Sequence, residues 1–94
     1  MSGFVHRVGD PSTQDEYPTH ATQGSWHTAV IEWTPSRIAF YLDGALAGVE
    51  GYPGAIPHKR MHWVLQTETA AGVEPDESAS GDVQIDWVTI WSRT

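Results

Sequence analysis

The chain has 94 residues and no cysteine, and twelve acidic against five basic side chains give it a formal net charge of -7. This length suits one domain, and the lack of cysteine excludes a disulfide framework. The acidic balance argues against nucleic acid and anionic membranes as partners, because both attract clustered Lys and Arg.

The first half of the chain predicts β-strands. β-Branched and aromatic residues fill its apolar runs, and no apolar set recurs with helical spacing. The start, "MSGFVHRVGD", lacks the basic region and cleavage site of an export signal, so we expect a soluble chain. Asp43-Gly44 predicts a type I′ turn. Strands are expected at residues 3–8, 26–34, 37–42 and 45–49, with a long polar loop over 10–25.

The second half predicts two more strands, separated by an acidic loop that begins near residue 69. In residues 60–68, Met61, Trp63 and Leu65 alternate with His62, Val64, Gln66 and Glu68. Residues 82–92 alternate in the same way and become apolar on both faces towards their end. The six expected strands together predict an all-β, antiparallel sandwich.

Four blocks of the sequence follow one another in a familiar order: "GFVHRVG", "WHTAVIEWTPSRIAFYLDGALAG", "IPHKRMHWVLQTE" and "VQIDWVTIW". The second block contains an aromatic-His-Thr stretch, an acidic-Trp-x-Pro stretch and an Asp-Gly hairpin. Together the blocks resemble the C-terminal half of a glycoside hydrolase family 16 domain, the β-glucanase and laminarinase family. The resemblance implies a concanavalin A-like jelly-roll fragment that occupies residues 1–94 as a single partial domain.

The resemblance also indicates what this sequence lacks. The family's catalytic strand carries Glu-x-Asp-x-Glu and should precede Gly3, where no such motif occurs. Retaining glycosidases need two carboxyl groups about 5–5.5 Å apart. Asp82 and Asp86 share a predicted strand face, but Gln84 stands between them. Glu32 is interpreted as a hydrogen-bonded or surface carboxylate, and the pairs Asp15-Glu16 and Asp76-Glu77 as solvated loop charges. No catalytic residue is predicted.

Sugar binding and metal binding are the site chemistries that remain. The resemblance implies that Met61, Trp63 and Leu65 point between two sheets, whereas substrate-binding residues face the concave side of the fold. These substrate-binding residues are His6, Gln66, Glu68 and His62, the last with the alternative of an ordinary surface histidine. It also matches Asp86 to an aspartate that ligates structural calcium in many members, although calcium takes six to eight oxygens. His27 is expected to be packed and hydrogen-bonded. The five histidines lack the paired spacing of a zinc site.

These observations leave three functions open. The first is a catalytically incompetent fragment that self-associates, most simply as a dimer, because half a sandwich bares sheet edges and apolar faces; it would bind β-glucan weakly. The second is an active or complemented β-glucan hydrolase. The third is a stand-alone carbohydrate-binding module that uses exposed Trp and Tyr rings, whereas the competing interpretation places most of the five tryptophans in the core. The family is typically secreted, but the sequence leaves the location undecided.

Overall fold

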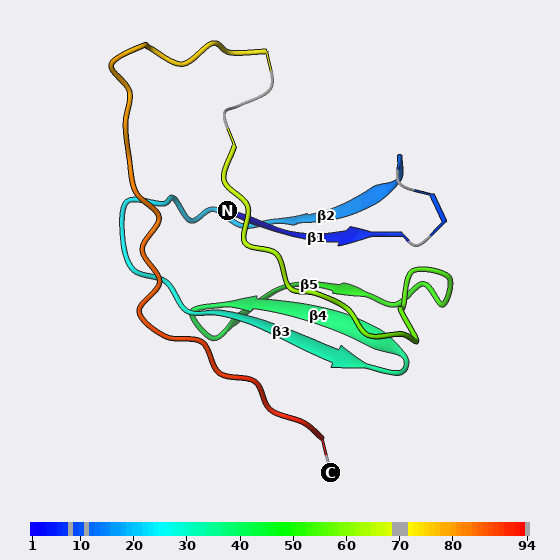
Figure 1. Cartoon of the computed structure of the whole chain (residues 1–94). Helices are drawn as coiled ribbons and strands as arrows, with labels where there is room; N and C mark the ends of the chain where they lie inside the picture. Colours follow the sequence, from blue (N-terminus) through cyan, green and yellow to red (C-terminus); the bar gives the residue numbers. More distant parts are fainter. Residues whose placement is uncertain (8, 11, 69–71, 94) are drawn as a thin grey trace. The chain divides into compact units, whose positions relative to one another are not determined.

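The computed structural model describes residues 1–7, 9–10, 12–68 and 72–93 (Figure 1). The chain forms two compact units, Met1–Met61 and His62–Thr94. No helix in the described ranges is long and apolar enough to cross a membrane.

All strands of the described residues lie in the first unit and pair antiparallel. One sheet has two strands, in the order β1-β2, and the other has three, in the order β3-β4-β5. The all-β sandwich prediction is therefore confirmed. The bounds are β1 Ser2–His6, β2 Gln14–Pro18, β3 Ala29–Thr34, β4 Arg37–Leu42 and β5 Ala45–Glu50.

The structure corrects three of the predicted elements. β2 lies inside the expected loop over residues 10–25, and the described residues of 60–68 and 82–92 contain no strand. A strand persists only when a neighbouring strand satisfies its backbone groups, and these two segments have no such neighbour in the described residues. Trp63 and Leu65, expected between two sheets, are about half exposed. Val8, the predicted end of the first strand, lies outside the described residues.

The hairpin between β4 and β5 forms as predicted. Asp43 and Gly44 have φ values of 50° and 80°, which is the positive pair that a type I′ turn requires. The β4-β5 register then shifts between Phe40 and Tyr41, so one β5 residue bulges out of the ladder.

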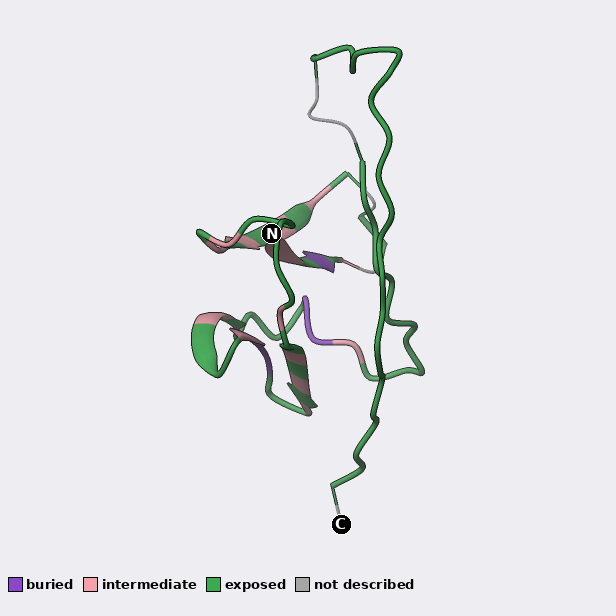
Figure 2. Cartoon of the chain, turned by 90° about the vertical axis from the view of Figure 1, so that its left-hand side faces the viewer, coloured by how far each residue is buried: buried purple, intermediate pink, exposed green. Residues whose placement is uncertain are grey.

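The core lies where the two sheets face each other (Figure 2). The Tyr17 ring stacks on Phe40 with 5.3 Å between ring centroids, which joins β2 to β4. Two glycines allow this approach. A Cβ on Gly48 would collide with the Tyr17 ring, and one on Gly3 would lie 2.5 Å from Phe40 Cδ1. The buried members of the cluster are Val5, Ile38, Phe40, Ala55 and Ile56.

A polar network closes one end of this core. Glu50 is buried, and it accepts hydrogen bonds from the Tyr17 hydroxyl at 3.0 Å and from the Tyr52 amide at 2.7 Å. Burial and the Glu50 carboxylate raise the pKa of Tyr17 to about 12. Arg7 forms a bidentate ion pair with Asp15 and lies 4.7 Å from the Tyr52 ring centroid. The network therefore links β2 to β5 through neutral as well as charged groups.

Gly48→Ala should destabilise the first unit, because the added methyl group has no space beside the Tyr17 ring. Overpacking of this kind costs about 1–3 kcal/mol in the free energy of unfolding, measured by urea denaturation. Gly51→Ala is the matched control, since a Cβ there meets nothing within 4 Å. Equal stability of the two variants would contradict the close contact between β2 and β5.

Candidate functional site

The outer face of the β1-β2 sheet carries the first candidate site. Gly3 and Val5 point towards β4, so by strand alternation Phe4 and His6 point away from it. The register places Phe4 opposite Glu16 and His6 opposite Gln14. Both Phe4 and His6 are exposed. A flat ring beside an imidazole, an amide and a carboxylate provides both a stacking surface and hydrogen-bonding groups for a hydroxyl-rich ligand.

His6 is exposed on this face, and its role in substrate binding stays a prediction; the arrangement adds two residues beside it. Gln14 and Glu16 were missed because residues 10–25 were expected to form a loop. The signal was the alternation in Gln14–Pro18, which places Asp15 and Tyr17 inside and the polar residues outside. Glu16 Oε1 accepts a hydrogen bond of 2.8 Å from the Ser2 hydroxyl, which fixes the carboxylate on this face.

The other predicted substrate-binding residues lie in the second unit. His62, Gln66 and Glu68 are exposed, and the Gln66 amide donates to Glu68 Oε2 at 3.0 Å. The structure thus brings Gln66 and Glu68 together. His6 belongs to the first unit, so a common cleft that includes all four residues stays a prediction.

Several carboxylates of the described residues take part in ion pairs or hydrogen bonds. Glu32 pairs with Arg37 at 2.6 Å, as expected for a surface carboxylate, whereas Asp15 is half-buried against Arg7 and is not a solvated loop charge. A general acid needs a raised pKa. Hydrogen bonds instead lower the pKa of four aspartates: Asp10 from Ser12, Asp15 from Arg7, Asp43 from the Thr28 amide and Asp76 from Ser78.

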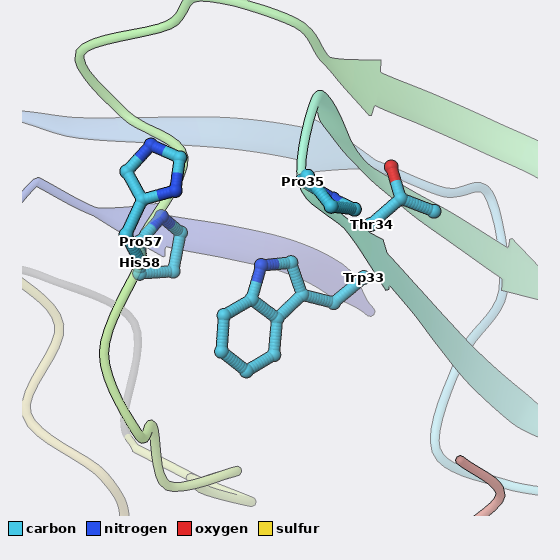
Figure 3. A pocket seen from close by; sticks show the side chains of 5 residues that line it. All are labelled: Trp33, Thr34, Pro35, Pro57 and His58. Atoms are coloured by element: carbon cyan, nitrogen blue, oxygen red, sulfur yellow. The ribbon is translucent and has the colours of Figure 1, made fainter. Parts of the chain in front are cut away.

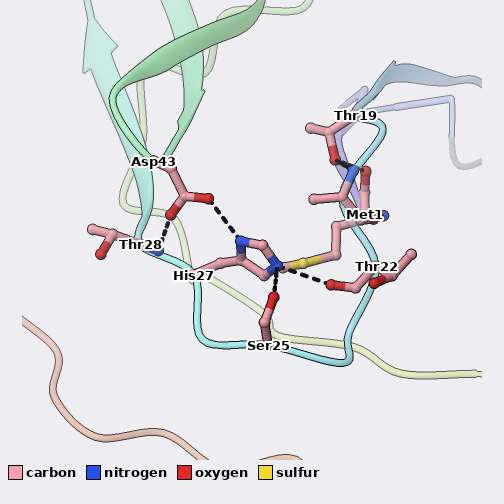
Figure 4. A network of polar contacts seen from close by, with 8 residues as sticks. Met1, Thr19, Thr22, Ser25, His27, Thr28 and Asp43 are labelled. Atoms are coloured by element: carbon pink, nitrogen blue, oxygen red, sulfur yellow. Dashed lines mark hydrogen bonds and ion pairs between the residues drawn. The ribbon is translucent and has the colours of Figure 1, made fainter.

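A second cluster surrounds His27, which is packed and hydrogen-bonded as predicted (Figure 4). Its Nδ1 lies 2.7 Å from Asp43 Oδ2, and the other Asp43 oxygen accepts from the Thr28 amide at 2.8 Å. Its Nε2 lies 3.1 Å from the Ser25 hydroxyl and 2.9 Å from the Thr22 carbonyl. These contacts connect the β4-β5 turn to the segment that precedes β3.

The order Ser25, His27, Asp43 is that of a serine nucleophile, a base and an orienting acid, but the Thr22 carbonyl changes the chemistry. The Thr22 carbonyl oxygen can only accept a hydrogen bond, so it favours the form of His27 that carries a proton on Nε2. A general base that activates Ser25 would need this nitrogen to be unprotonated. The Asp43 carboxylate likewise favours a proton on Nδ1. Hydrogen bonding to Asp43 raises the pKa of His27. His27 therefore holds the loop and the turn together as a double donor.

A hollow of about 270 Å³ lies beside the end of β3 (Figure 3). The Trp33 indole lies between the Thr34-Pro35 turn on one side and Pro57-His58 on the other, and it is 47% exposed. Ligand pockets usually measure about 300–1,000 Å³, so this hollow suits one ring-sized group. Its lining offers an aromatic face with hydroxyl, imidazole and indole hydrogen-bonding groups.

The family of this chain follows from a comparison of its sequence with models of known protein families. The family model described as "Glycosyl hydrolases family 16" matches residues 2–89. The chain belongs to glycosyl hydrolases family 16. No curated protein and no solved structure matches it.

Metal binding by this family 16 chain would need several His, Asp or Glu side chains close together. Among the described residues, no three His, Asp or Glu side chains gather in a way that could hold an ion. Asp86, the residue matched to a calcium ligand, is exposed. In the part of the chain that the structure describes, Asp86 therefore has no cluster of further acidic or histidine side chains beside it.

The His27 contacts predict a pH dependence of stability for the family 16 chain. Asp43 and Thr22 raise the pKa of His27, while burial and the Met1 ammonium oppose them. A raised folded-state pKa stabilises the fold below the unfolded value of about 6.5, and this stabilisation is lost as the pH rises through the folded value. The difference in thermal midpoint between wild type and His27→Gln should thus be larger at about pH 5.5 than at about pH 9.

NMR titration of the His27 ring measures the same effect directly. Its midpoint should lie above that of an unstructured peptide covering residues 22–30. A midpoint at or below that of the peptide would show that the contacts to Asp43 and Thr22 do not retain the ring protons.

Proposed function

We propose that this chain is the C-terminal half of a family 16 jelly roll that is inactive in isolation, self-associates, and binds β-glucan weakly. The observation that carries the proposal is the exposure of its large apolar side chains. Each such side chain would gain about 1.5–3 kcal/mol if it were fully buried. Those more than half exposed in the second unit include Trp63, Leu65, Val83, Ile85, Trp87 and Ile90.

A second copy is the simplest cover for these side chains, and a dimer is the smallest closed assembly. Sedimentation velocity over a wide concentration range tests this part of the proposal. We expect a dimer whose population falls on dilution. A compact, well-folded monomer at every concentration would contradict self-association, because the apolar side chains would then be stable in water without a cover.

The carboxylates support the proposed lack of activity. The sequence contains no Glu-x-Asp-x-Glu, and Asp15, Glu32 and Glu50 are held by hydrogen bonds or ion pairs. Two free carboxyl groups with separated pKa values are the minimum for a retaining glycosidase. The alternative is an active or complemented β-glucan hydrolase, in which a further strand supplies these groups.

Laminarin and lichenan distinguish these alternatives. The isolated chain should release no reducing ends from either polysaccharide, measured by a colorimetric reducing-sugar assay against buffer. Release that disappears in Glu68→Gln would instead support the hydrolase and assign Glu68 to it. Release that Glu68→Gln leaves unchanged would contradict inactivity without involving that residue.

Weak glycan binding is proposed at the predicted residues His6, Gln66, Glu68 and His62. The Trp33 hollow favours a second candidate, a stand-alone carbohydrate-binding module, because a half-exposed indole between prolines is a stacking platform for a pyranose ring. The two candidates use different residues. They can therefore be separated by variants on the same chain.

Titration of tryptophan fluorescence with soluble β-glucan oligomers measures the binding. We expect a fluorescence response at millimolar ligand. His6→Ala should weaken the affinity for the oligomers severalfold, whereas Trp33→Ala should leave this affinity unchanged when it is measured from the other tryptophans. Trp26→Ala serves as a control, since Trp26 is exposed outside the hollow. Loss of binding in Trp33→Ala alone would favour the binding module, and no response from wild type would exclude both candidates.

A further inference from the structure

The inner face of the β3-β4-β5 sheet is covered over only part of its width. Ile31 stands opposite Phe40 and Trp33 opposite Ile38, so all four side chains point the same way. Phe40 and Ile38 are buried, whereas Ile31 is 43% exposed and Trp33 47%. The covering layer therefore ends before it reaches β3.

β1 is the strand at which this cover ends. Tyr17 of β2 lies against Gly48 of β5, and Gly3 of β1 lies against Phe40 of β4. The covering layer thus runs from above β5 towards β3. Among the described strands only β2 pairs with β1, so a further strand in this layer would pair with the other edge of β1 and pack on the inner face of β3.

The backbone of β1 has groups free for such pairing. The Thr19 amide donates to the Met1 carbonyl and the Arg7 amide to the Thr13 carbonyl, so the odd-numbered residues bond towards β2. In an antiparallel pair the intervening residues point their backbone groups the other way. The amides and carbonyls of Ser2, Phe4 and His6 therefore face the free edge.

This edge also lacks the features that usually prevent pairing. Its sequence, Ser-Gly-Phe-Val-His, contains no Lys, Asp, Glu or Pro. The opposite edge of the same sheet, Gln-Asp-Glu-Tyr-Pro in β2, carries two acids and a proline. Charged side chains and proline are the common protection of sheet edges, so β1 is the open edge of this pair.

We propose that the free edge of β1 accepts residues 83–88 of a second copy as an added strand. This inference rests on the self-association in the proposed function and names its contact. Val83, Ile85 and Trp87 alternate with Gln84 and Asp86 and are more than half exposed, and residues 83–88 form no strand in their own chain. Docked on β1, these apolar side chains cover Ile31 and Trp33 while the polar ones face solvent.

The space beside β1, over the inner face of β3, does not allow the β1 edges of two copies to pair with each other. β3 extends beyond the cover that β1 and β2 provide, so a second sandwich joined at β1 would place its own three-stranded sheet where β3 already lies. The slot therefore takes a single extended segment. Residues 83–88 are such a segment.

Two charged substitutions and their mixture test the proposal. Ile31→Asp blocks the acceptor and Ile85→Asp blocks the donor. The matched controls are Val49→Asp, on the other face of the same sheet at 41% exposure, and Val73→Asp, at an exposed position outside the donor segment. Sedimentation velocity should show at least a tenfold weaker dimer for each test variant and wild-type association for both controls.

The mixture of Ile31→Asp and Ile85→Asp should form a heterodimer, because each partner keeps the half that the other lacks. Association of both variants at wild-type strength would overturn the strand contact and leave self-association intact. A wild type that stays monomeric would overturn both the strand contact and self-association. If residues 83–88 instead dock within their own chain, the wild type should be monomeric and Ile85→Asp should be less stable than the wild type.

A backbone variant keeps the test valid if Ile31→Asp fails to fold. Phe4→Pro removes an amide that points to the free edge and no β1-β2 hydrogen bond, whereas Phe4→Thr removes the ring but keeps the amide. Weaker association in Phe4→Pro than in Phe4→Thr supports pairing at β1. Equal association in the two variants overturns it.

Discussion

The Tyr17 ring lies where only a glycine at position 48 allows β2 to approach β5, and its hydroxyl donates to the buried Glu50 two residues further along. Most of the first unit depends on this contact. It sets the β1-β2 sheet over β4 and β5, and the Tyr17 ring buries Phe40 by stacking on it. The Glu50 carboxylate is buried at this contact, where it accepts hydrogen bonds from the Tyr17 hydroxyl and the Tyr52 amide. The same placement leaves Ile31 and Trp33 on the inner face of β3 partly exposed, at 43% and 47%.

That geometry also determines where recognition chemistry can occur. Gly3 and Val5 are used for packing, so the alternate residues of β1 present Phe4 and His6 outward, opposite Glu16 and Gln14. The carboxylates nearest the core are engaged in the Arg7 and Tyr17 contacts. Asp15 and Glu50 of this family 16 chain are therefore engaged in contacts that hold its strands together.

The hairpin could be predicted because it depends on local signals, namely the Asp43-Gly44 turn and the alternation in Arg37–Leu42. β2 was missed because Asp15, Glu16 and Pro18 are typical of loops, and only pairing with β1 makes them a strand. Residues 60–68 and 82–92 have the alternation of strands, but alternation supplies no hydrogen-bond partner. Whether such a segment forms a strand depends on a neighbour that its own sequence does not specify.

An open β1 edge next to the partly exposed inner face of β3 is the central feature of the first unit, and amide hydrogen exchange measures that edge residue by residue. At low chain concentration the Phe4 amide should exchange rapidly while the Gly3 amide, bonded towards β2, is protected. At high concentration the Phe4 amide should become protected as the added strand docks. A Phe4 amide that exchanges at the same rate at every concentration, in a chain that nonetheless associates, would contradict the account.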